Sequence, residues 1–217
     1  KYLTKGENIM GNRAIIKGKD SDLGVYVHWN GGRDSVEAFL EYASFLSPHS
    51  GLGEKYYDSG LGTLVTLITN FMNNSSSVDI TTTDDYANPS HLDNGIYVVD
   101  GWEIVDRISP PLYEQNGYDR REMLIAIDDA QPEKMKRGVD YIDSEIVDAS
   151  EIVVGDEIIQ NKIGGGVEKY TVISLGNPDN PKEAMHHPPY SPYIGKYGKD
   201  NPNSYISGRV RRVKKVA

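Results

Sequence analysis

Short runs of apolar and β-branched residues mark the strand-forming segments of the first part of the chain. Residues 13–17 (RAIIK) and 24–29 (GVYVHW) predict two short strands joined by the polar turn 18–22. Residues 78–82 predict a third strand, and residues 95–108 predict a hairpin that turns at a two-residue Asp-Gly sequence. We expect these segments to form one antiparallel sheet.

Three other segments repeat apolar residues at the helical spacing of three or four positions. The first covers residues 36–43 and is expected to end before Pro48. The third begins near Asp119, which has capping-box spacing with Glu122. The second has the longest apolar stripe, formed by Leu61, Leu64, Val65, Ile68, Phe71 and Met72. The pattern therefore predicts an α+β domain with three helices on an antiparallel sheet.

The pattern changes after residues 131–138, where Pro132 interrupts the helical spacing and Gly138 ends it. Beyond this segment, short strand-like runs follow one another without a helical segment. A Pro-, Gly- and Tyr-rich loop over residues 176–204 separates the last of them. This arrangement predicts a small SH3-like β-barrel. We therefore expect an α+β domain at residues 10–134 and a barrel domain at residues 139–217.

The N-terminal residues 1–9 lack the basic stretch and apolar core of a signal peptide. Lys5-Gly6-Glu7 can be encoded by a purine-rich ribosome-binding sequence just before the codon of Met10, so residues 1–9 are expected to be a translated leader. The chain has no cysteine, which excludes disulfides and thiolate metal sites. No apolar run approaches the roughly 20 residues of a membrane span. We expect a cytoplasmic protein without a membrane partner.

The stretch HWNGGRD at residues 28–34 combines a turn with reactive side chains, and it allows two interpretations. In the first, Asp34 and Glu37 form a capping box, and the two glycines permit a tight turn between strand and helix. In the second, the glycines and the helix N-terminus present N–H groups to a phosphate or carboxylate, and an arginine completes the site. The candidate ligand-binding residues are His28, Trp29, Asn30, Gly31, Gly32 and Arg33.

Tyrosines and basic residues alternate near the C-terminus, and such a pattern is typical of nucleic-acid binding, because aromatic rings stack on bases and cations follow the phosphates. The alternative is a surface loop that packs through its own tyrosines. The net charge of −9 argues against broad nonspecific binding of nucleic acid by the whole chain. The basic residues near the C-terminus are therefore the candidate nucleic-acid-binding segment. The candidate nucleic-acid-binding residues are Tyr193, Lys196, Tyr197, Lys199, Arg209, Arg211 and Arg212.

Other catalytic and metal-binding patterns are missing from the sequence. No histidine spacing matches a zinc site, and His186 and His187 are followed by two prolines that forbid a helical ligand pair. The sequence GLGTL at residues 60–64 lacks the lysine of a P-loop, and no nucleophile elbow is present. We therefore expect no metal and no cofactor, and assign no catalytic residue.

The segment GNRAIIKGKDSDLGVYVHWNGGRDSVEAFL at residues 11–40, with LVTLITNFM and the DNGIYVVDGWEIVDR hairpin, resembles an uncharacterised family of phage and prophage proteins of Gram-positive bacteria. The resemblance covers about residues 11–130 and implies no activity. Our first hypothesis is a non-enzymatic phage accessory protein that binds a host protein or nucleoprotein, such as a defence component, in the bacterial cytoplasm. The alternatives are a binder of a phosphate-bearing small molecule or of nucleic acid and, last, a hydrolase or transferase that uses His28.

Overall fold

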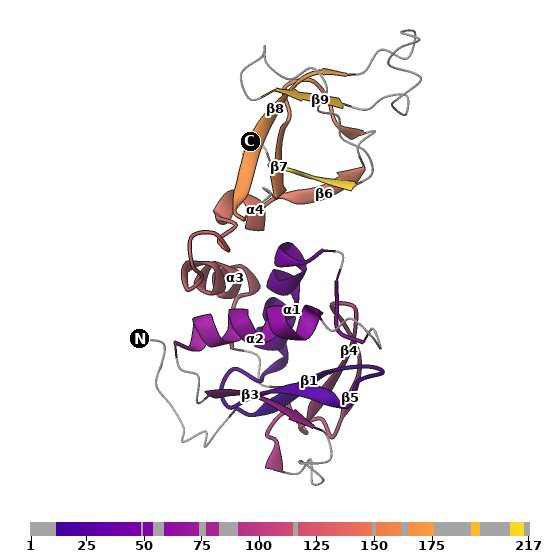
Figure 1. The fold of residues 1–217 in the computed structure, drawn as a ribbon, viewed down its shortest axis with the longest axis vertical. Coiled ribbons are helices and arrows are strands. Elements are labelled where there is room, and N and C mark those ends of the chain that lie inside the picture. The colour runs from indigo at the N-terminus through magenta and orange to yellow at the C-terminus, as the bar shows by residue number, and fades with distance from the viewer. Residues whose placement is uncertain are drawn as a thin grey trace. The chain divides into compact units, whose positions relative to one another are not determined.

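The computed structural model divides the chain into two compact units, Lys1–Pro132 and Glu133–Ala217, which are described separately (Figure 1). The expected leader, residues 1–9, lies outside the described residues. The structure describes residues 12–48, 50–53, 59–73, 77–82, 91–114, 117–148, 151–161, 165–175, 192–195 and 209–214.

The first unit contains a five-stranded sheet in the order β3-β2-β1-β4-β5. The predicted strands are present, but the sheet is mixed and not antiparallel, because β1 pairs with β4 in parallel. The chain leaves β1 and reaches β4 only after two helices, and a crossover of this length allows parallel pairing. The strands are β1 (Ala14–Gly18), β2 (Leu23–Val27), β3 (Val78–Thr82), β4 (Ile96–Asp100) and β5 (Glu103–Ile108).

The described residues of the first unit form three helices, as the apolar spacing predicts: α1 (Arg33–Leu46), α2 (Ser59–Met72) and α3 (Arg120–Asp129). Figure 1 shows α1 and α2 on the same side of the sheet. Phe39 of α1 packs edge-on against Phe71 of α2, with ring centroids 5.4 Å apart. Asp119 is the N-cap of α3 and accepts a hydrogen bond from the Glu122 N–H at 3.0 Å, so this capping prediction is confirmed.

The strand register sorts the sheet's side chains between its two faces. Ile16 is level with Val25 on one side and with Tyr97 on the other, and all three are fully buried. The hydroxyl of Tyr97 donates a hydrogen bond to the carbonyl of Gly31, just before α1, at 3.0 Å. This set therefore faces the helices, while Ile15 packs with Ile96 on the opposite face.

The second unit contains an antiparallel five-stranded sheet in the order β6-β10-β7-β8-β9, with β6 and β9 outermost in the pairing of the described residues. Its core consists of Val147, Ile152, Ile158, Val172 and Val210. A short helix, α4 (Val139–Ile142), with Gly138 as its N-cap, lies where we expected only strands. The strands are β6 (Glu145–Asp148), β7 (Glu157–Asn161), β8 (Val167–Leu175), β9 (Pro192–Gly195) and β10 (Arg209–Arg212).

The segment 131–138 is packed at two positions and is not an exposed linker throughout. Gln131 is 3% exposed and donates to the carbonyls of Leu67 and Ile127. Arg137 is 6% exposed. No helix in the described part of the chain is both long and apolar enough to cross a bilayer.

Candidate functional site

The turn HWNGGRD connects β2 to α1, as expected. Asn30 adopts a φ of 58°, in the left-handed region that asparagine tolerates better than most residues. Gly31 is buried, and a Cβ atom there would lie 2.5 Å from the carbonyl oxygen of Asn12 and 2.8 Å from the Cβ of Ala14. Position 31 must therefore lack a side chain. Gly32 then forms the N-cap of α1 with an extended backbone.

Asp34 is not the cap of α1, so the predicted capping box with Glu37 is wrong. The N-cap is Gly32, which makes no side-chain cap, and Asp34 is the second residue of the helix. Its Oδ1 accepts the Ser35 N–H at 2.7 Å, and its Oδ2 accepts the N–H groups of Gly117 and Tyr118 at 2.7 and 3.0 Å. Asp34 thus joins α1 to the chain after β5.

Glu37, the other half of the predicted box, pairs with Arg33. The Nε of Arg33 lies 2.7 Å from the Oε1 of Glu37, and both side chains are half-exposed. The hydrogen bond to Glu37 raises the pKa of Arg33. An exposed pair of this kind contributes about 0–1 kcal/mol. The arginine of the predicted anion site is therefore held by a neighbouring carboxylate.

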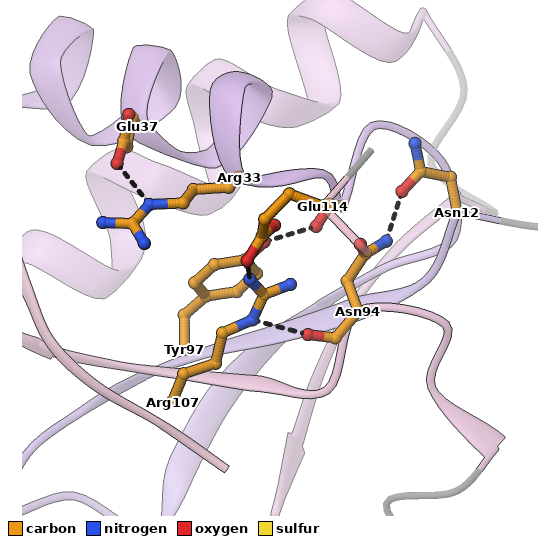
Figure 2. Close-up of polar contacts among 8 residues, drawn as sticks. Asn12, Arg33, Glu37, Asn94, Tyr97, Arg107 and Glu114 are labelled. Atoms are coloured by element: carbon orange, nitrogen blue, oxygen red, sulfur yellow. Dashed lines mark hydrogen bonds and ion pairs between the residues drawn. The ribbon is translucent and has the colours of Figure 1, made fainter. Parts of the chain in front are cut away.

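A cluster of polar contacts lies beside this turn, around Arg107 of β5 (Figure 2). Its guanidinium stacks on the ring of Tyr97, 4.2 Å from the ring centroid. Its Nε donates to the carbonyl of Asn94 at 2.9 Å, and its Nη1 forms an ion pair with Glu114. The Arg107 side chain is only 10% exposed. A cation this deeply buried is uncommon unless it is paired.

Two polar atoms in this cluster have no hydrogen-bond partner among the described residues: the Nη2 of Arg107 and the Oδ1 of Asn94. Asn94 is fully buried, and its Nδ2 donates to the Oδ1 of Asn12. Burial raises the pKa of Tyr97, so its hydroxyl stays protonated and donates to Gly31. Tyr97 of β4 thus connects the candidate turn to β5, because its hydroxyl binds Gly31 and its ring stacks with Arg107.

Sequence reasoning missed Arg107, Tyr97, Asn94 and Glu114. Arg107 occurs in the run EIVDRI, where an arginine is typical of an exposed edge strand. Only the register of β4 and β5 shows that Arg107 lies opposite Tyr97 on the helix side of the sheet. The sole sequence signal is an arginine and a glutamate seven positions apart on either side of two prolines, which by itself has no specific meaning.

The segment between β5 and α3, which we call the 109–118 loop, presents a pair of adjacent apolar side chains that are almost fully exposed. Leu112 is 95% exposed and Tyr113 is 85% exposed. Just after them, Glu114 pairs with Arg107, and Gly117 and Tyr118 bind Asp34. The loop is therefore held at two points while its apolar residues face solvent.

The remaining predicted turn residues make contacts of their own. The Nδ1 of His28 lies 2.9 Å from the hydroxyl of Tyr26, and its ring packs edge-on against Trp29 at 4.8 Å. Trp29 is 45% exposed. Asn30 contacts the sulfur of Met72 at 3.5 Å. These partners hold the turn against β2 and α2.

The basic residues of the predicted nucleic-acid tip are partly engaged within their own unit. Arg211 stacks on Tyr141 at 4.4 Å, and Arg212 pairs with Glu145 at 2.7 Å, which raises the pKa of Arg212. Tyr193 and Arg209 belong to β9 and β10. The other predicted residues of the tip lie outside the described residues: Lys196, Tyr197 and Lys199.

Within the described ranges, no group of three or more acidic or histidine side chains is arranged to hold a metal ion. Comparisons of the chain with protein-family models, with curated proteins and with solved structures found no match. The resemblance to phage proteins therefore stays a hypothesis, and the function has to be inferred from the contacts above.

Proposed function

We propose that this is a non-enzymatic binding protein that docks onto a partner protein through the 109–118 loop. The observation that carries the proposal is the exposure of Leu112 and Tyr113, at 95% and 85%. Isolated exposed apolar residues are common, but two adjacent large ones that are almost fully exposed are a typical interaction site. Tyrosine is also enriched among the residues that contribute most to protein–protein binding.

The attachment of the loop supports the same proposal. Pro110 and Pro111 restrict the backbone before the apolar pair, and the Arg107–Glu114 ion pair fixes the residue that follows it. A loop that is already ordered loses less conformational entropy when it binds. The contacts that order this loop thus prepare Leu112 and Tyr113 for burial in a partner.

The resemblance of residues 11–40 to phage proteins supports a host macromolecule as the partner, such as a defence component in the bacterial cytoplasm. The net charge of −9 supports a partner with a basic surface, because opposite charge speeds association. The second unit, with its five antiparallel strands, is proposed to be a small SH3-like barrel. Its stacked and paired arginines give weaker support to nucleic acid as a direct ligand.

A pull-down from host lysate tests the proposal. The double variant Leu112→Ser/Tyr113→Ser should lose a stoichiometric protein partner that the unaltered chain retains. The matched control is Val153→Ser/Val154→Ser, another adjacent apolar pair that is 53% and 56% exposed. Retention of the partner by the loop variant, or equal loss in the control, would contradict docking through this loop.

A photocrosslinking residue in place of Tyr113 supplies a second measurement that does not depend on affinity. It should crosslink the captured partner, whereas the same residue in place of Val154 should not. A co-purifying nucleotide without a protein partner would instead favour the small-molecule alternative.

A further inference from the structure

The Arg107 side chain is buried with an incomplete set of partners. Two of its three nitrogens are bound, Nε to the Asn94 carbonyl and Nη1 to Glu114. The third, Nη2, is buried without a partner in the part of the chain that the structure describes, and the side chain is 10% exposed. A buried donor left unpaired is destabilising, because it has lost its hydrogen bonds to water and gained none in the protein. Nη2 of Arg107 can therefore still donate a hydrogen bond to a ligand.

We propose that Arg107 is the centre of a binding site for a phosphate group, and that Glu114 occupies this site in the ligand-free protein. Glu114 contacts a single guanidinium nitrogen, so its carboxylate does not use the two-nitrogen fork of Arg107. A phosphate offers three terminal oxygens and binds this fork with two parallel hydrogen bonds. A bound phosphate would thus accept the hydrogen bond from Nη2 that Glu114 does not accept.

Neighbouring groups add positive potential at the same place. Tyr97, under the guanidinium, binds Gly31, so the site lies beside the start of α1. The first backbone hydrogen bond of α1 runs from the Val36 N–H to Gly32, so the earlier N–H groups have no backbone acceptor within the helix, and that of Ser35 is bound by the Asp34 side chain. Such N–H groups and the helix dipole favour an anion. The pKa of Arg33 is raised chiefly by Glu37 and, to a smaller extent, by the negative charge of Glu114.

Two nearby carboxylates would repel a bound anion, but each already has a hydrogen-bond or ion-pair partner. Asp34 accepts three backbone N–H groups, and Glu37 is paired with Arg33. Glu114 is the carboxylate placed directly on Arg107, and its side chain is 34% exposed, so it can leave the site toward solvent. Binding of phosphate would release the Glu114 attachment of the 109–118 loop, while the attachment to Asp34 remains.

The test is calorimetric titration of the full chain with inorganic phosphate at constant ionic strength. Glu114→Gln removes the internal competitor and should bind phosphate about tenfold more tightly than the unaltered chain. The double variant Glu114→Gln/Arg107→Lys keeps the charge but lacks the fork, and should lose this gain. Glu133→Gln, which alters an exposed pair with Lys136 in the second unit, is the charge-matched control and should not change phosphate binding.

Two results would overturn the proposal. If Glu114→Gln binds phosphate no more tightly than Glu133→Gln, Glu114 is a structural partner of Arg107 and a water molecule meets the unpaired nitrogen. If the double variant keeps the gain, phosphate binds elsewhere. Circular dichroism shows whether each variant is folded, and the comparison of Glu114→Gln with Glu133→Gln decides the question even if Arg107→Lys does not fold.

Discussion

Replacement of Asp34 by alanine should detach the 109–118 loop from α1 and destabilise the first unit. Asp34 accepts N–H groups from Ser35 within the helix and from Gly117 and Tyr118 in the loop. The two loop contacts join residues more than 80 positions apart in the chain. Their loss should therefore affect tertiary structure and not only the end of a helix.

The expected loss of unfolding free energy is about 2 kcal/mol. A hydrogen bond to a charged group contributes about 1.5–3 kcal/mol. Gly117 and Tyr118 are exposed, and water binds their amides once Asp34 is gone, so we reduce the contribution to about 0.5–1 kcal/mol for each. A negative charge in the first helical turn adds about 0.3–1 kcal/mol.

Urea unfolding followed by tryptophan fluorescence measures this loss without interference from the second unit. The chain has two tryptophans, Trp29 and Trp102, and both belong to the first unit. Hydrogen exchange supplies the local measurement, because the amides of Gly117 and Tyr118 should exchange faster in the variant.

Asp119→Ala is the matched control, since Asp119 caps α3 through a single N–H, that of Glu122. It should cost about 1 kcal/mol, the usual loss at an N-cap, and leave exchange at Gly117 unchanged. Unchanged exchange at Gly117 and Tyr118 in Asp34→Ala would refute the joining role, as would a loss of stability below about 0.5 kcal/mol.

Three further substitutions test other parts of the first unit. Gly31→Ala should cost about 2 kcal/mol in urea unfolding, because its Cβ would lie 2.5 Å from a backbone oxygen, whereas Gly62→Ala in α2 meets no atom within 4 Å and should be neutral or stabilising. Trp29→Ala should cost about 1 kcal/mol by circular dichroism, since the indole is 45% exposed, and a loss of about 3–5 kcal/mol would show that it is buried. The hydrogen bond from Arg13 lowers the pKa of Asp93, so this pair stabilises the fold above the ordinary carboxyl pKa, and the stability is lost as pH falls below about 4. Asp93→Asn should remove that part of the acid dependence, and an unchanged stability–pH curve would contradict the pairing.

The helices could be predicted from the sequence because their signals are local. The stripe of α2 and the Asp119 cap of α3 depend on residues three or four positions apart, and both appear in the structure. The Asp34–Glu37 pair has the same spacing as a capping box, yet Gly32 starts the helix. Spacing alone does not distinguish a cap from two acids inside the first turn.

The mixed sheet and the arginine cluster depend on contacts between distant residues, and no local pattern reports them. The parallel pairing of β1 with β4 sets the position of Tyr97 beside the start of α1. The register of β4 with β5 then places Arg107 on the same face. The sequence correctly indicated the turn at residues 28–34 as a place of interest, but the charged group buried beside it comes from a strand about 75 positions later.

The two attachments of the 109–118 loop differ in what they hold. Glu114 directly follows the exposed pair Leu112 and Tyr113, so its contact with Arg107 sets where those side chains lie. Asp34 binds the far end of the loop, where α3 is about to begin. Loss of the Arg107 contact should therefore change the conformation of the apolar pair while the fold persists. A phosphate bound at Arg107 would act on this same contact, so the small-molecule site and the docking loop would respond to one ion pair.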